Sequence, residues 1–157
     1  MRAVTSERKG TIEQVDVGRT HALYRDAGEL SVRWCESSVL VVLRDHGQGG
    51  FSSIIRRYWD EALLRTPRVT LLADFWSMPT YDSPLRLDLT SWLLDHRPRV
   101  AELHVLTRSR IVTMGVAVAN LALGGLVTNH RTRAPFDEAV ARFPFQSARP
   151  SEAKGAG

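Results

Sequence analysis

The sequence predicts one α/β domain in which a mostly parallel central sheet follows an N-terminal hairpin and helices alternate with strands. Two observations support this fold class: short segments have strand patterns, and longer segments with helical periodicity alternate with them from Val39 onward. Such alternation is typical of parallel strands joined by right-handed crossovers. The length of 157 residues suits a single domain with a substantial hydrophobic core.

The predicted strands show two apolar patterns. Over residues 30–35, apolar and polar residues alternate, which indicates a strand with one buried face. Residues 39–43 form a continuous apolar run, which indicates a strand buried on both faces. The turn 36–38 joins these two strands into the hairpin. Further strands are predicted at residues 69–73, 103–106 and 126–128.

The predicted helices carry apolar residues at intervals of three and four positions. The first covers residues 51–63 without a break in the pattern and follows the glycine-rich loop 47–50. The second covers residues 84–96, the third residues 110–123, and the last begins near Pro135 and extends to Phe143. The expected order is therefore strand, strand, helix, strand, helix, strand, helix, strand, helix.

Both ends of the chain are polar. We expect a tail or short edge element over residues 1–20, the folded domain over residues 21–143, and a disordered tail over residues 144–157. No apolar run approaches the roughly 20 residues that cross a bilayer, and no apolar segment follows the charged N-terminus, so neither a membrane span nor a signal peptide is expected. A lone cysteine, Cys35, excludes an intrachain disulfide and fits the cytoplasm.

Composition and motifs exclude several function classes. The net charge of +4 is carried almost entirely by arginine, without a lysine-rich run or zinc-finger spacing, so nucleic acid is not an expected partner. The five histidines lack metal-ligand spacing, and no nucleophile motif is present, so we expect no metal, no cofactor and no enzymatic activity.

The segment that joins the third predicted strand to the second helix carries the first candidate site. Asp74 ends the strand, and Asp82, Ser83 and Pro84 open the helix. Helix N-termini bear unpaired N–H groups and partial positive charge, so polar and anionic groups are stabilised there. Two interpretations stay open. Ser83 is either a simple helix cap with Pro84 as the first helical residue, or a functional residue that acts as a phosphoacceptor or as a polar contact to a partner.

Four arginines follow the ends of two predicted parallel strands: Arg108, Arg110, Arg131 and Arg133. Because parallel strands end at the same edge of a sheet, these cations are expected near Asp82. They form either an anion contact or a solvated rim in which an arginine pairs with Asp82 or Asp137.

The helix predicted over residues 110–123 is apolar on nearly all sides, with Thr113 and Asn120 as its polar residues. A helix of this kind must be covered on both sides. One hypothesis is that a loop or the N-terminal tail covers it. The other is an interface with a partner, a second copy or a lipid, formed by Ile111, Met114, Val118 and Leu121.

From residue 29 to residue 143 the chain resembles the STAS domain, the family that includes anti-sigma-factor antagonists of the SpoIIAA type and the cytoplasmic tails of sulfate transporters. The resemblance rests on residues 69–85, 102–123 and 124–140. The family's turn reads Asp-Ser, then a phosphorylated Ser or Thr, then Gly. Here Asp82 and Ser83 match, but Pro84 and Leu85 occupy the acceptor and glycine positions, so this would be a divergent member.

The resemblance implies a non-catalytic protein-recognition module in bacterial-type signalling, whose contacts centre on Asp82, Ser83, Pro84 and Arg86. Its partner would be an anti-sigma or kinase-like regulator, or another adaptor, and the apolar helix could form a homodimer. The alternative hypothesis is a carrier that holds a small apolar, acyl or lipid ligand beneath the helix 110–123, with Arg108 or Arg131 at the head group.

Overall fold

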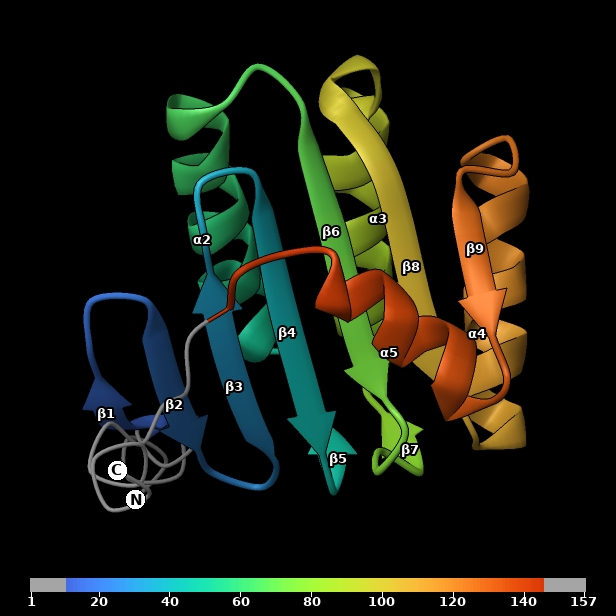
Figure 1. The fold of residues 1–157 in the computed structure, drawn as a ribbon. Coiled ribbons are helices and arrows are strands. Elements are labelled where there is room, and N and C mark those ends of the chain that lie inside the picture. The colour runs from blue at the N-terminus through green and yellow to red at the C-terminus, as the bar shows by residue number, and fades with distance from the viewer. Residues whose placement is uncertain (1–10, 146–157) are drawn as a thin grey trace.

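The structure, a computed structural model, describes residues 11–145. A seven-stranded sheet carries α2, α3 and α4 on one face and α5 on the other (Figure 1). The sheet strands are β1 (Glu13–Val17), β2 (His21–Arg25), β3 (Glu29–Trp34), β4 (Ser38–Arg44), β6 (Val69–Phe75), β8 (Val100–Thr107) and β9 (Val127–His130). The helices are α2 (Phe51–Arg65), α3 (Ser83–Asp95), α4 (Arg110–Ala122) and α5 (Arg133–Ala141), with a short 3-10 helix η1 (Arg97–Arg99) after α3.

The sheet is mixed, with the strand order β1-β2-β3-β4-β6-β8-β9. Strands β1 to β4 pair antiparallel, and β4, β6, β8 and β9 pair parallel. The expectation of a mostly parallel sheet is therefore wrong for the N-terminal half. The physical reason is connection length: three residues separate each pair of successive strands from β1 to β4, whereas a parallel pair needs a crossover of about a dozen residues.

The N-terminal half also contains a strand that the sequence analysis did not assign. Strand β2 turns only Ala22 and Tyr24 inward, so its alternating pattern is short. Strand β1 is the fully exposed edge strand and pairs with β2, so the expected domain boundary at residue 21 lies inside this hairpin. Residues 1–10 and 146–157, which hold most of the two predicted tails, lie outside the described residues.

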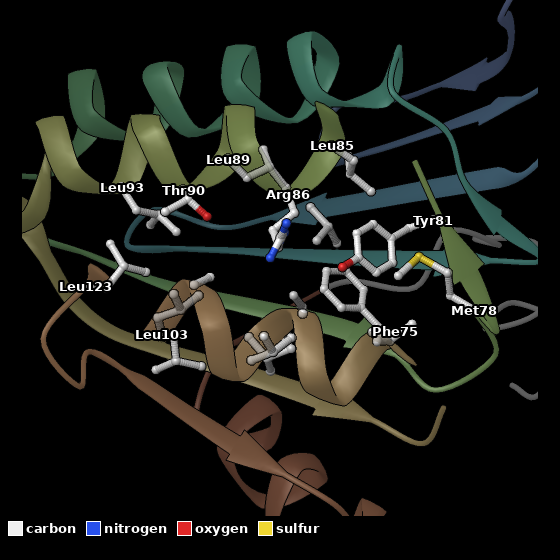
Figure 2. A pocket seen from close by; sticks show the side chains of 18 of the residues that line it. Phe75, Met78, Tyr81, Leu85, Arg86, Leu89, Thr90, Leu93, Leu103 and Leu123 are labelled. Carbon is white, nitrogen blue, oxygen red and sulfur yellow. The ribbon is translucent and has the colours of Figure 1, made fainter. Parts of the chain in front are cut away.

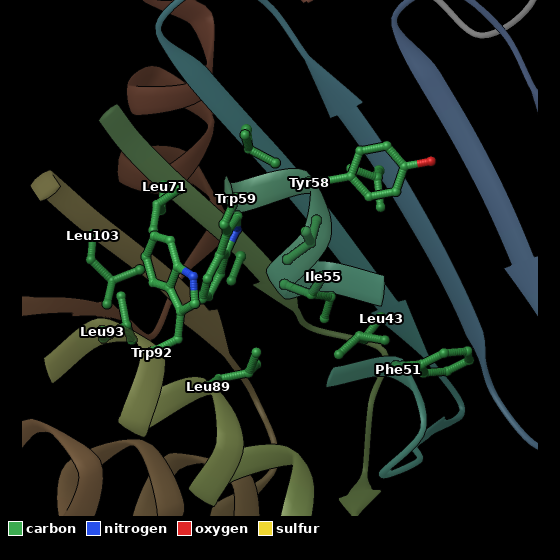
Figure 3. Packing of buried hydrophobic residues seen from close by; sticks show 14 of the residues in the cluster. Leu43, Phe51, Ile55, Tyr58, Trp59, Leu71, Leu89, Trp92, Leu93 and Leu103 are labelled. Carbon is green, nitrogen blue, oxygen red and sulfur yellow. The ribbon is translucent and has the colours of Figure 1, made fainter. Parts of the chain in front are cut away.

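The larger hydrophobic core lies between the sheet and helices α2, α3 and α4. Phe51 and Ile55 of α2 belong to this core together with Leu43 of the sheet, which lies near them in Figure 3. Trp59 of α2 and Trp92 of α3 meet with ring centroids 5.0 Å apart. The Trp92 indole donates a 2.7 Å hydrogen bond to Asp60, so α2 and α3 are joined by packing and by a polar contact.

A smaller core lies on the opposite face, beneath α5. Leu40, Leu72 and Leu106 come from three neighbouring strands and pack against Phe136 and Ala139 of the helix. The central strands β4 and β6 are therefore buried on both faces, as their continuous apolar runs predict. Within residues 11–145, no helix combines the length and the apolar character needed to span a bilayer.

Because α5 packs on the sheet without a neighbouring helix among residues 11–145, Phe136 is the main contact of the smaller core. We expect Phe136→Ala to lower the free energy of unfolding by about 3–5 kcal/mol, since it removes a 1% exposed ring and leaves a cavity. Urea denaturation followed by circular dichroism measures this change. Leu64→Ala is the control, because Leu64 is 87% exposed and its truncation is expected to change stability by less than about 0.5 kcal/mol.

Candidate functional site

The parallel strands β4, β6 and β8 end at one edge of the sheet, and the loops that follow them meet there (Figure 1). A second, two-stranded sheet extends this edge, where β5 (His46–Gly47) pairs parallel with β7 (Thr80–Tyr81). The pairing places the loop before α2 beside the loop before α3. This contact brings His46 and Thr80 beside Asp82.

Asp82 connects the starts of the two helices. Its carboxylate accepts a 2.9 Å hydrogen bond from the backbone N–H of Gly49 and another of 2.9 Å from Nε2 of His46. Its own backbone N–H donates to the carbonyl of Gly47 at 2.7 Å. The Gly49 N–H, and then the hydrogen bond from His46, hold the pKa of Asp82 below its ordinary value. Asp82 therefore acts as a joint between α2 and α3.

His46 was not singled out by the sequence analysis. Its Nδ1 lies 2.9 Å from the hydroxyl of Thr80 while its Nε2 contacts Asp82, so the three side chains form a hydroxyl–imidazole–carboxylate chain. Hydrolytic triads use the same order of groups. Thr80 is exposed, and neither Thr80 nor His46 lines the cavity beneath α4 or the groove beside it.

The structure changes the expected role of Ser83. Asp82 occupies the N-cap position of α3, and Ser83 and Pro84 are its first two helical residues. The interpretation of Ser83 as the helix cap is therefore wrong, because the residue before it has the extended backbone of a cap. Within the described residues, the exposed hydroxyl of Ser83 has no hydrogen-bond partner.

The four arginines do not gather around Asp82. Arg133 pairs with Asp74 at 3.0 Å and with Asp137 at 3.2 Å, and these carboxylates raise its pKa. Arg108 and Arg133 both lie over the ring of Trp76, at 5.4 and 5.9 Å from its centroid. The expected pairing with Asp137 is thus present, and the pairing with Asp82 is wrong because His46 occupies that place. Arg110 and Arg131 are exposed.

The outward face of α4 is open. Its apolar side chains are between 54% and 84% exposed, and they are Ile111, Met114, Val118 and Leu121. Within residues 11–145, no loop covers this face, which was one of the two hypotheses for it. The inward face packs closely through Gly115, where an added Cβ would lie 2.2 Å from the Tyr81 hydroxyl oxygen.

A groove and a cavity lie where α3 meets α4. The groove, of about 260 Å³, is lined by Tyr81 and Arg86 and by the residues of α4 from Ile111 to Val118 that face them. The cavity, of about 90 Å³, lies beneath α4 and also contacts Tyr81, Arg86 and Gly115. Arg86, predicted as a partner contact, therefore lies between the two helices. Arg108 and Arg131 line neither space.

A histidine pair joins β8 to β9 on the opposite face. His104 contacts Glu102 through Nε2 at 2.7 Å and His130 through Nδ1 at 3.0 Å, so both of its ring nitrogens have a partner. Burial, and then the neighbouring His104, lower the pKa of His130. Protonation of His130 is therefore less favourable in the folded state than in the unfolded state. The contribution of this group to the free energy of unfolding is present above the ordinary histidine pKa and is lost as the pH falls below it.

A solved structure with a SpoIIAA-like fold is similar in architecture to this mixed sheet and its helices. Among solved structures, the chain is similar to an uncharacterised protein of the DUF3478 family from Shewanella loihica PV-4, described as having this fold, with a TM-score of 0.52 and 11% sequence identity. The match covers 78% of this chain and 97% of that chain. The fold of a divergent STAS or SpoIIAA-like domain is thereby confirmed. No family model and no curated protein matches the chain.

The lowered pKa of Asp82 predicts that its contribution to the free energy of unfolding depends on pH. Because the folded-state pKa of Asp82 is lowered, its contribution to stability is present above the unfolded value of about 3.9 and is lost as the pH falls through the lower folded value. Asp82→Asn should therefore lower the free energy of unfolding by up to about 1 kcal/mol near pH 7, and the difference from wild type should shrink near pH 3.

Urea denaturation at both pH values measures this effect. Asp95→Asn is the matched control, since Asp95 is an exposed aspartate of the same helix that has no partner in the described part of the chain. An Asp82→Asn variant that differs equally from wild type at both pH values would contradict the assignment.

Proposed function

We propose that this domain is a non-catalytic, cytoplasmic protein-recognition module in bacterial-type signalling, comparable to an anti-sigma-factor antagonist. The observation that carries the proposal is the exposed apolar face of α4 directly beside the start of α3. Ile111, Met114 and Val118 are all more than half exposed and border the same groove. Exposed apolar patches with a polar rim are typical of protein interfaces.

The recognition surface is continuous across the two helices. Tyr81 and Arg86, which flank Ser83 in the sequence, line the groove together with Met114. Ser83 and Pro84 are themselves exposed. The site expected from the STAS resemblance and the apolar face of α4 therefore lie side by side and can act as one binding surface. In that surface α4 provides apolar contacts and the start of α3 provides polar ones. A partner such as an anti-sigma or kinase-like regulator would bury both.

The geometry at Ser83 bears on how such a module is controlled. Proline has no hydroxyl, so Pro84 cannot take a phosphate at the position that the family uses. The neighbouring hydroxyl of Ser83 is exposed in the first turn of α3, where a phosphate is stabilised by the helix N-terminus. If phosphorylation controls partner binding, Ser83 is the acceptor that the geometry favours.

The arrangement of Asp82 supports a non-catalytic role. In the chain of Thr80, His46 and Asp82, the carboxylate also binds the Gly49 N–H and so holds two loops together. A catalytic role would need a substrate pocket against the Thr80 hydroxyl, and Thr80 lines neither the cavity beneath α4 nor the groove beside it.

The proposal predicts that a charge on the face of α4 removes the partner. Met114→Asp should reduce the amount of partner captured at least about tenfold, because it places a carboxylate in the apolar centre of the interface. The measurement uses the tagged, purified chain in extracts of the organism that encodes it, with captured proteins quantified by mass spectrometry.

Leu64→Asp is the matched control, since Leu64 is an exposed leucine of α2, away from this surface. A protein captured equally by all three forms would refute the assigned surface. Analytical ultracentrifugation separates the homodimer: self-association of wild type that Met114→Asp abolishes would show that a second copy, and not a regulator, occupies the face.

A further inference from the structure

The cavity beneath α4 is lined mainly by apolar side chains from the sheet, α2, α3 and α4. Its walls include Val41, Ala73, Leu89, Val105 and Val116. Figure 2 shows Arg86 reaching from α3 toward α4, beside the ring of Tyr81. A guanidinium directed into an apolar space is costly unless it is hydrogen-bonded or paired with a charge, so the surroundings of Arg86 matter.

Two buried side-chain nitrogens have no hydrogen-bond partner within the described residues, and both belong to residues that line this cavity. They are Nε of Arg86 and Nε1 of Trp59. Both atoms are donors, and neither can accept a hydrogen bond. Nearly all buried polar groups in folded proteins have a partner, so the unpaired Nε of Arg86, whose side chain reaches toward α4 at this cavity (Figure 2), calls for an acceptor-bearing molecule.

The charge balance of the cavity points to an anion. Among the described residues that line the cavity, Arg86 is the one with a charged side chain. Arg86 forms no ion pair within residues 11–145. The acidic residues nearest to it in the sequence are engaged elsewhere: Asp82 binds His46 and Gly49, and Asp88 accepts a 2.8 Å hydrogen bond from Ser52. The cation is therefore uncompensated by the protein.

We propose that this cavity binds a small monocarboxylic acid, with its apolar tail beneath α4 and its carboxylate on the guanidinium of Arg86. Charge-assisted hydrogen bonds between a guanidinium and a carboxylate are among the strongest that side chains form. This assignment makes the carrier hypothesis specific and corrects its head-group contact, since Arg108 and Arg131 do not reach the cavity. The ligand and the protein partner would share the groove at Arg86, but the ligand proposal is argued from the cavity and its unpaired guanidinium and does not require a protein partner.

The volume limits the size of the ligand. An engineered cavity of about 150 Å³ holds benzene, so a cavity of about 90 Å³ takes a tail of only a few carbons. The adjoining groove shares Tyr81, Arg86 and Gly115 with the cavity and has about 260 Å³ for the carboxylate and its water. The ligand class is therefore a short-chain acid and not a long lipid.

Isothermal titration calorimetry with hexanoate tests the proposal, with hexanol and hexylamine as neutral and cationic molecules of equal chain length. Wild type should bind hexanoate more tightly than hexanol, and hexylamine should not bind. Arg86→Met should weaken hexanoate at least about tenfold while leaving hexanol unchanged, because it keeps the apolar stem of the side chain and removes the charge. Arg110→Met is the matched control, since Arg110 is exposed on α4.

The position of the ligand is tested separately by the indole N–H proton resonances. Hexanoate should shift the resonance of Trp59, which lines the cavity, and leave that of Trp34 in place, because Trp34 does not line it. Ala119→Leu, which fills the cavity from α4, should weaken hexanoate and hexanol alike. Equal binding of hexanoate and hexylamine, unchanged hexanoate binding by Arg86→Met, or no binding of any of the three molecules would overturn the proposal.

Discussion

Parallel pairing of β4, β6, β8 and β9 is the constraint on which the rest of the structure depends. A parallel strand must begin at the same edge as its neighbour, so the chain returns across the sheet after every strand, and helices α2, α3 and α4 make these returns. Every helix of that layer therefore starts at the edge where its preceding strand ends. The Asp82 joint, the exposed start of α3 and the groove beside α4 all follow from this geometry.

Two local contacts determine how closely the helices of this layer approach one another. The Asp82 carboxylate holds the Gly49 loop, which places the first turns of α2 and α3 side by side. The ring of Tyr81 then rests on Gly115 of α4. Arg86 lies in the first turn of α3, and its side chain lines the apolar cavity together with Tyr81 and Gly115. An apolar space with a cation at its boundary is the result.

Much of the fold could be predicted from the sequence, because hydrophobic periodicity reports directly which faces are buried. The helix beginning at Phe51 and the strand beginning at Val69 match their predicted starts. Strand β2 escaped detection because only Ala22 and Tyr24 face the core. Because β2 pairs antiparallel with both β1 and β3, missing this strand also led to too low an estimate of the antiparallel part of the sheet.

The site was predicted less completely, because it depends on contacts between residues far apart in the chain. Asp82 and the apolar face of α4 were found from local pattern. His46 was not, since its role arises from β5 pairing with β7, two strands of two residues each. In the sequence, Arg86 has the position of a surface arginine on an amphipathic helix. Only the packing of α3 against α4 in the structure shows where its side chain points. The contact of Tyr81 with Gly115 also makes position 115 a sensor of the ring beside it. A methyl group added at position 115 would lie 2.2 Å from the Tyr81 hydroxyl oxygen, so Gly115→Ala would have to push the phenol away from α4. A shorter side chain at position 81 would leave room for that methyl group, so the tightness of this end of the helix layer depends on two side chains 34 positions apart in the sequence.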